Sequence, residues 1–425
     1  MKIKTRTMPY EKVMALPKVK HRKPLRPNFI LSTVVRVAAI FDLFPTRFRY
    51  TTEGLEKIKG QPCLILMNHS SFIDLKIISK IMYPKPYGIV CTHDTLVGKE
   101  WLMRFLGCVP TRKFVSDMSL IRDMEYLLKE KKTSVLMYPE AGYTFDGTTT
   151  TLPRKLGILL KKLGVPVVSV ITSGAFARDP LYNMLQLRKV NVTAQVKCLC
   201  TAEEVMEKSV KELDALIDET FSFDNFAWQK ENNIQIKEAF RADGLHRILY
   251  KCPHCGAEGQ MEGKGTSIAC YHCAKTWELT ELGELAAREG ETEFSHVPDW
   301  YAWQRQEVRK ELENGTYKLD TDVSIAMMVD YKALYMVGDG RLRHNESGFL
   351  LTGDDGKLRY EQGPVACHSL NSDFFWYEIG DVIGIGNNEA LYYCFPKDNT
   401  PVAKTRLAAE ELYKLKKARK APATE

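Results

Sequence analysis

The chain has 425 residues, of which 44% are hydrophobic and 27% charged, and its formal net charge is +7. This composition is typical of a folded globular protein and excludes a disordered or collagen-like chain. The chain is too long to fold around a single small hydrophobic core, so we expect two or three domains. Only four of the eleven cysteines show an ordered spacing, and we therefore expect a reduced, cytosolic protein.

Positive charge is concentrated at the two ends of the chain. Residues 1–27 carry nine lysines and arginines against a single acid, and a second basic cluster lies at 413–420. Such ends favour nucleic acid or anionic lipid, or form a solvated tail. The most apolar segment, residues 29–44, is too short to span a bilayer and is interrupted by Arg36 and Asp42. We expect either a helix half-sunk in the cytoplasmic leaflet, which would make the protein peripheral or monotopic, or a buried core helix.

Between residues 61 and 200, short apolar runs alternate with longer stretches of helical spacing. The expected strands are 63–67, 87–91, 133–138, 165–171 and 190–199. This alternation predicts an α/β layer, with a mainly parallel or mixed sheet flanked by helices. Thr201 and Glu204 form a capping-box pattern, which predicts a following helix of about 18 residues.

The stretch NHSSFID, directly after the expected strand CLILM, contains His69 and Asp74. A helix is expected to begin near Phe72, because the two serines before it are good capping residues. The Asp74 carboxylate can then reach one imidazole nitrogen of His69, fix its tautomer and raise the basicity of the other nitrogen. A nitrogen so activated at the carboxyl end of a strand suits a general base for a substrate hydroxyl. The alternative is a histidine with a structural role.

A histidine followed five positions later by an aspartate, after an aliphatic strand, resembles the first motif of the PlsC-like glycerolipid (1-acylglycerol-3-phosphate type) acyltransferases. Further stretches resemble the other family motifs in the same order: GCVPTRK (107–113) the second, YPEAG (138–142) the third and VPVVSV (165–170) the fourth. The resemblance covers about residues 50–245.

The resemblance implies that His69 and Asp74 are catalytic. His69 would take the proton from a lysophospholipid hydroxyl as this group attacks the thioester of acyl-CoA or acyl-carrier protein, without an acyl-enzyme intermediate. The implied reaction converts lysophosphatidate to phosphatidate, so the expected partners are a membrane lipid acceptor and an acyl donor.

The resemblance also implies a substrate-binding set, with two departures from the family. In the second motif Arg112 and Lys113 are adjacent, and either can contact the substrate phosphate. In the third motif Ala141 stands before Gly142, and Tyr143 stands near the usual position of a phosphate-binding arginine. Glu140 is expected to hold the acceptor or the active-site loop, and Arg178 can act as a substitute anion contact. The implied substrate-binding residues are Arg112, Lys113, Glu140, Gly142 and Arg178.

Two Cys-x2-Cys knuckles, CPHC and CYHC, are separated by fourteen residues. Two such knuckles place four thiolates around one Zn²⁺, whereas disulfides are disfavoured in a reducing compartment. The expected ligands are Cys252, Cys255, Cys270 and Cys273. They leave no open coordination position, so the metal would be structural, and a ribbon of about 30 residues has too little core to fold without it. Few basic and aromatic residues occur between the knuckles, so we expect a protein partner, through the ribbon or the C-terminal region, and no nucleic acid.

Beyond about residue 300, β-like segments are separated by turn signals, and the closing segment is strongly helical. This pattern predicts a small barrel or sandwich of the pleckstrin-homology kind. We expect four parts: a basic N-terminal segment (1–27), an acyltransferase domain with a membrane-associating helix (28–245), a zinc ribbon (246–285), and a β-rich domain with a C-terminal helix (300–425).

Two other functions stay open. One is a membrane-associated scaffold that binds lipid or a partner and carries a degenerate acyltransferase domain, for which the altered third motif argues. The intact His69 and Asp74 argue against it. The other is a zinc-ribbon nucleic-acid binder, which would need a basic stacking platform that the ribbon lacks.

Overall fold

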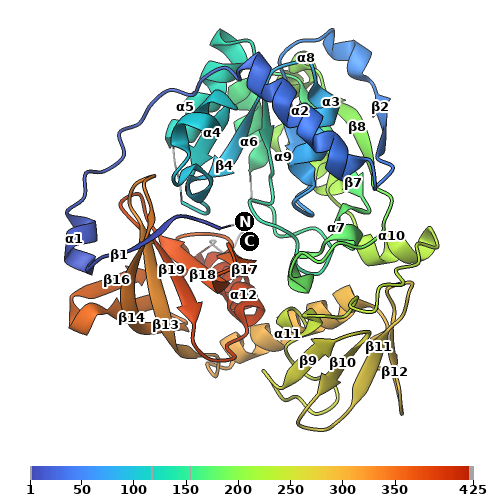
Figure 1. The fold of residues 1–425 in the computed structure, drawn as a ribbon, viewed down its shortest axis with the longest axis vertical. Coiled ribbons are helices and arrows are strands. Elements are labelled where there is room, and N and C mark those ends of the chain that lie inside the picture. Colours follow the sequence, from blue (N-terminus) through green and yellow to red (C-terminus); the bar gives the residue numbers. More distant parts are fainter. Residues whose placement is uncertain (1, 116–117, 154, 421–425) are drawn as a thin grey trace, which may run out of the picture.

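The computed structural model describes residues 2–115, 118–153 and 155–420, and three β-sheets organise them (Figure 1). The α/β unit is built on a seven-stranded sheet with the strand order β2-β8-β7-β3-β6-β4-β5. Its strands are β2 (Arg49–Glu53), β3 (Leu64–Met67), β4 (Tyr87–Thr92), β5 (Cys108–Thr111), β6 (Ser134–Met137), β7 (Val167–Ser173) and β8 (Thr193–Cys200). All neighbours pair in parallel except β7 and β8, which are antiparallel. The expected mixed α/β sheet is therefore confirmed.

Helices cover both faces of this sheet. The helices of this unit are α2 (Phe29–Leu43), α3 (Asp74–Met82), α4 (Glu100–Phe105), α5 (Met118–Glu125), α6 (Leu156–Leu163), α7 (Ala175–Arg178), α8 (Ala202–Glu207), α9 (Val210–Thr220) and α10 (Asn225–Glu231). Alternate residues of the central strand β3 enter two separate cores. Ile65 packs with α2 and α3, and Leu66 packs with α6 and α9. A strand buried on both faces must be apolar throughout, which explains the run LILM.

The capping box at Thr201 forms as predicted, but the helix behind it is much shorter than about 18 residues. Helix α8 stops at Glu207, and a second capping box, made by Ser209 and Glu212, opens α9. A serine side chain that caps the next helix competes with continuation of the first helix, so the segment divides in two.

The second sheet is a four-stranded antiparallel meander that carries the two cysteine knuckles. Its strands are β9 (Met261–Lys264), β10 (Ser267–Cys270), β11 (Thr276–Leu279) and β12 (Leu285–Ala287). Trp277 of β11 packs edge-to-face on Trp300 of α11 (Val297–Glu313), with ring centroids 5.1 Å apart. The Trp300 indole N–H donates to the Lys251 carbonyl at 2.9 Å. The ribbon therefore shares a core with the long helix that follows it.

The third sheet has the order β16-β15-β14-β13-β19-β18-β17, so the first strand of the meander pairs with the last. Its strands are β13 (Leu319–Met328), β14 (Leu334–Asn345), β15 (Gly348–Gly353), β16 (Leu358–Gln362), β17 (Asn371–Trp376), β18 (Gly380–Gly386) and β19 (Leu391–Pro396), followed by helix α12 (Val402–Lys420). A short N-terminal strand, β1 (Thr5–Thr7), pairs in parallel with β14, and α1 (Tyr10–Met14) follows it. Likeness to a pleckstrin-homology domain stays a prediction.

The β-rich domain and α12 lie beneath the carboxyl ends of the central strands of the α/β unit (Figure 1). One hydrophobic core joins the three parts: it contains Phe145 of the α/β unit, Trp277 of the ribbon and Leu407 of α12. The carboxyl edge of the seven-stranded sheet therefore faces protein rather than open solvent.

Helix α2 presents a continuous apolar face to the outside. The exposed apolar residues at helical spacing are Ile30, Val34, Val37 and Phe41, followed by Phe44 directly after the helix, and they are 51–82% exposed. On the other side of the helix, Ala39 and Leu43 belong to the core. Asp42 forms an ion pair with Lys76 of α3 at 2.8 Å, which accounts for one charge in this apolar segment. In the part of the chain that the structure describes, every helix is too short or too polar to cross a bilayer.

Candidate active site and metal centre

His69 lies just beyond the carboxyl end of β3, and Asp74 is the first residue of α3. The Nδ1 atom of His69 is 3.0 Å from Oδ2 of Asp74. The same carboxylate oxygen accepts hydrogen bonds from the backbone N–H groups of Ser70 at 2.9 Å and Ser71 at 3.1 Å. An oxygen that already accepts two backbone N–H groups acts as an acceptor toward the ring as well, so the imidazole proton is assigned to Nδ1 and Nε2 is the acceptor.

Burial acts on both members of this pair. It lowers the pKa of His69 well below its ordinary value, and the positive charge of Lys113 lowers it further. Burial also raises the pKa of Asp74 to about 8, against the opposing effect of the Ser71 and Ser70 N–H groups. A low pKa keeps the imidazole neutral at physiological pH, which is the state in which Nε2 can accept a proton.

Two tyrosine rings enclose the imidazole. The Tyr138 ring stacks on one side with centroids 3.9 Å apart, and the Tyr143 ring stacks at 3.8 Å. Only 16% of the His69 side chain is exposed. Among the residues that the structure describes, none is hydrogen-bonded to Nε2. A substrate hydroxyl could therefore reach His69 only along the ring edge that carries Nε2.

The loop that follows β6 holds the backbone of His69 at two points. Glu140 is buried, and its Oε2 accepts from the His69 N–H at 2.8 Å while its Oε1 accepts from the Thr150 N–H at 3.0 Å. The Thr144 N–H donates to the His69 carbonyl at 3.1 Å. Of the two roles expected for Glu140, the geometry favours holding the loop, because both of its oxygens are bonded within the protein. Burial raises the pKa of Glu140 to about 7.

The departure in the third motif has a backbone consequence. Ala141 has φ of 53°, in the left-handed region that favours glycine. A Cβ atom added to Gly142 would meet nothing within 4 Å. Ala141 therefore occupies the turn position that needs a glycine-like conformation, and Gly142 lies in open space beside it. The substrate-binding role of Gly142 stays a prediction.

The three predicted cations are placed differently. Lys113, after β5, is close enough to His69 for its charge to lower the pKa of the imidazole, whereas the charge of Arg112 acts on Tyr331 and Tyr393 of the β-rich domain. Of the two adjacent residues, Lys113 is thus the one whose charge acts on His69. Arg178 is buried in α7 and donates to its neighbour Asp179 at 3.1 Å. Its role as an anion contact stays a prediction.

Residues of the β-rich domain reach the same edge, and the sequence analysis missed them. Tyr377 donates its hydroxyl to Asp94 at 2.8 Å, and Phe374 packs on Phe145 with ring centroids 4.3 Å apart. Asp373 is buried close to Lys113, whose charge opposes the rise that burial causes in the pKa of Asp373. No sequence signal could reveal these contacts, because about 230 to 280 residues separate the partners.

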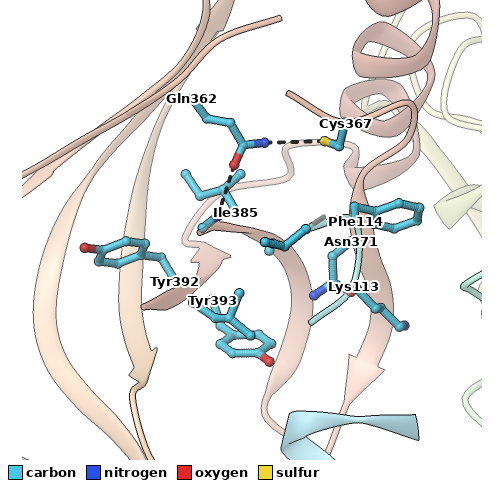
Figure 2. Close-up of a pocket in the computed structure, with 12 residues that line it drawn as sticks. Lys113, Phe114, Gln362, Cys367, Asn371, Ile385, Tyr392 and Tyr393 are labelled. Atoms are coloured by element: carbon cyan, nitrogen blue, oxygen red, sulfur yellow. Dashed lines mark hydrogen bonds between the residues drawn. The ribbon is translucent and has the colours of Figure 1, made fainter. Parts of the chain in front are cut away.

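A cavity of about 20 Å³ lies where the second-motif loop meets the β-rich domain, and Figure 2 shows the residues that line it. Gln362 spans it, donating to Cys367 Sγ at 3.5 Å and accepting from the Gly386 N–H at 3.0 Å. Lys113 and Phe114 line the cavity from the α/β unit. The space suits about one water molecule and is too small for a lipid.

The four predicted metal ligands come together. The sulfur atoms of Cys252, Cys255, Cys270 and Cys273 all lie within 4.8 Å of one another. Sγ of Cys252 is 3.8 Å from that of Cys273, and Sγ of Cys255 is 3.8 Å from that of Cys270. Zn–S bonds of about 2.3 Å in a tetrahedron require sulfur atoms about 3.8 Å apart. The cluster therefore fits Zn²⁺, and the separation excludes disulfide bonds.

This geometry has the features of a general-base site at the carboxyl edge of a mixed α/β sheet. Residues 49–173 match the family described as Acyltransferase, so this part of the chain is an acyltransferase domain. It contains His69, Asp74, Lys113 and Glu140. A solved structure that is similar to the chain is the 1-acyl-sn-glycerophosphate (LPA) acyltransferase PlsC from Thermotoga maritima, with 18% identity over 45% of this chain and 76% of that chain, and a TM-score of 0.37.

Replacing Glu140 by glutamine should change how stability depends on pH. The pKa of Glu140 is raised in the folded state, so its contribution to stability is full below the unfolded pKa of about 4.5 and is lost as the pH rises through about 7. Urea unfolding of both proteins at pH 5 and pH 8 should show the difference in unfolding free energy shifting by about 1–3 kcal/mol in favour of Glu140→Gln at pH 8. An identical difference at the two pH values would contradict the raised pKa.

Removing the metal should destabilise more than the ribbon, because Cys252 and Cys270 belong to the same core as Trp300 and Leu407. We expect about one Zn²⁺ per chain by elemental analysis. Chelation, or Cys270→Ser, should lower the stability by several kcal/mol in circular-dichroism melts, with recovery on adding Zn²⁺ only in the chelated wild type. Cys91→Ser, outside the cluster, is the matched control and should keep its zinc. A metal-free protein that melts like the wild type would refute this structural role.

Proposed function

We propose that the protein is a glycerolipid O-acyltransferase that moves a fatty acyl group from acyl-CoA or acyl-carrier protein to a lysophospholipid hydroxyl, with lysophosphatidate as the first candidate acceptor. The observation that carries the proposal is the 3.0 Å contact between His69 Nδ1 and Asp74 Oδ2, which leaves Nε2 as the free acceptor. The acyltransferase match over residues 49–173 supplies the reaction class.

The proposed reaction is one direct transfer. Nε2 of His69 takes the proton of the acceptor hydroxyl while the hydroxyl oxygen bonds to the thioester carbonyl carbon. The C–S bond then breaks, and the departing thiolate receives the proton from Nε2, which restores the neutral imidazole. Asp74 stabilises the imidazolium that forms between these two steps. General-base catalysis accounts for about 10²- to 10⁴-fold of the rate enhancement, and positioning supplies much of the rest.

The acceptor phosphate has one favoured contact. Lys113 is the predicted cation whose charge acts on His69, while Arg178 is already paired with Asp179. Tyr143 occupies the face of the imidazole near the position where the family has an arginine. We therefore assign phosphate recognition to Lys113, with Arg112 beside it.

Two surface features support action on lipid at a membrane. The outer face of α2 is apolar along its whole length, and the basic residues of the N-terminal segment precede it. A cavity of about 1020 Å³, lined mostly by apolar atoms, lies between α2, α3 and α4 and includes Leu75, the residue after Asp74. We propose that α2 lies in one leaflet with its basic flank at the lipid headgroups, at the cytoplasmic face of the membrane.

The first test is an activity panel. Purified protein is assayed with acyl-CoA and with acyl-carrier protein against several lysophospholipids, and thiol release and acylated lipid are both measured. His69→Ala should lower turnover by about 10²- to 10⁴-fold, since it removes the proton acceptor, and its circular-dichroism spectrum should match the wild type.

The matched control for this panel is His93→Gln, at a second histidine that follows a strand, β4, but contacts Tyr331. This variant should keep its turnover. Near-normal activity of His69→Ala would exclude the proposed mechanism, and inactivity of the wild type toward every lysolipid and both donors would favour the scaffold function.

Membrane binding should depend on the outer face of α2. The double variant Phe41→Asp, Phe44→Asp replaces two apolar side chains that are 78% and 82% exposed by charged ones, so the fold should be kept. Its binding to vesicles should fall at least about tenfold. Sedimentation with anionic phosphatidylglycerol vesicles measures this, and raising the salt should weaken binding. Met206→Asp changes an exposed apolar residue on the opposite face of the sheet and should bind normally. Equal binding of all three proteins would contradict the assignment of α2.

A further inference from the structure

The last helix of the chain contacts the loop that holds the catalytic histidine. Arg406 of α12 is only 5% exposed, and its NH1 group donates to the Tyr143 carbonyl at 3.2 Å. The Tyr143 ring is the one that stacks on His69. The Arg406 guanidinium also lies 4.4 Å from the centre of the Phe145 ring, two residues further along the loop. One side chain thus fixes the loop at two neighbouring residues.

Arg406 is itself held in place by a buried charge network. Its Nε donates to Glu410 at 3.3 Å, and Arg305 of α11 donates to the same carboxylate at 2.7 Å. Although burial acts in the opposite direction, the two arginines hold the pKa of Glu410 at about 2, so the carboxylate stays ionised. Glu410 also accepts a hydrogen bond from Thr151 at the far end of the loop, at 3.3 Å.

Other contacts hold the later part of this loop: the Thr150 N–H donates to Glu140 at 3.0 Å, and the backbone and side-chain N–H groups of Asn225 donate to the Gly147 carbonyl at 3.0 and 2.7 Å. A cavity of about 310 Å³ lies between residues 145–151, α11 and α12, and Arg406 and Glu410 form part of its wall. Arg406 is the α12 residue that binds the loop at Tyr143, and its hydrogen bond fixes the backbone of the residue whose ring stacks on His69. A ring that must stay within van der Waals distance of an imidazole needs such a fixed backbone.

We propose that Arg406 is a positioning residue for His69: by holding the Tyr143 backbone, it keeps the Tyr143 ring on the imidazole and keeps water away from that face. The inference rests on the proposed function, because it assumes that His69 is the base. The inference also gives a role in acyl transfer to the C-terminal helix, which lies outside residues 49–173, the part of the chain that matches the acyltransferase family.

The proposal predicts a change in the pH profile. Burial keeps the pKa of His69 low, so freeing the Tyr143 ring should admit water and raise that pKa toward its ordinary value. The base must be unprotonated, and the acid limb of the rate profile should therefore move to higher pH. The charged or titratable groups that face His69 are Asp74 of α3, Lys113 after β5, and Tyr138, Glu140 and Tyr143 of the loop. Arg406→Gln keeps all five residues, but burial raises the pKa of Glu140 and the Arg406 charge opposes this rise, so the variant also raises the pKa of Glu140 and is paired with Tyr143→Ala, which keeps Arg406.

Arg406→Gln is the first test. It should lower kcat by about 10- to 100-fold with little change in KM, because ground-state contacts to substrate are kept. It should also move the acid limb upward by about half a pH unit or more. Lys404→Met is the matched control: Lys404 lies two residues away on α12 and pairs with Glu258 and Glu311, but not with the loop. It should lower stability and leave the pH profile unchanged.

Tyr143→Ala tests the same link from the other end without altering a charge, so it stays informative if Arg406→Gln does not fold. It should move the acid limb in the same direction, and the double variant should be no worse than the poorer single variant, because both act through one contact. An unshifted acid limb in Tyr143→Ala, additive losses in the double variant, or higher activity in Arg406→Gln would each overturn the proposal. Full activity of His69→Ala would instead refute the proposed function itself.

Discussion

The site depends on one carboxylate oxygen. Oδ2 of Asp74 receives N–H groups from Ser70 and Ser71 and lies 3.0 Å from Nδ1 of His69. Because the same oxygen fixes the turn that precedes α3 and orients the imidazole, this turn cannot change without moving the His69 ring. The neighbouring Asn68 binds Thr172 of β7 through both its amide oxygen and its amide nitrogen, so the turn is also attached to the adjacent strand.

Two further segments hold His69 around this turn. The loop after β6 binds the His69 backbone through Glu140 and Thr144 and encloses its ring between Tyr138 and Tyr143. Helix α12 then holds that loop through Arg406. Both segments lie further along the chain, so the environment that keeps the imidazole neutral is completed only when the C-terminal helix has docked. An isolated acyltransferase domain would lack the second of these segments.

Several local features were predictable because neighbours in sequence decide them. The central strands are uninterrupted apolar runs, the capping box at Thr201 needs only four residues, and the cysteine knuckles impose their own geometry. The length of the helix after Thr201 was predicted wrongly, because Ser209 can cap a new helix as readily as it can continue the old one. The basic N-terminal segment, which could have been a solvated tail, contributes the edge strand β1 to a sheet formed some 330 residues later.

The sequence by itself determined the α/β sheet, the four-cysteine cluster and the pairing of His69 with Asp74, since each follows from a pattern that is local in the sequence. Tertiary structure decided which face of the histidine stays open, which of the two adjacent cations acts on it, and that Glu140 faces inward to hold a loop. It also brought Asp373, Tyr377 and Arg406 to the edge of the sheet. Those contacts join surfaces hundreds of residues apart, and only the packing of the β-rich domain and α12 against the strand ends fixes them.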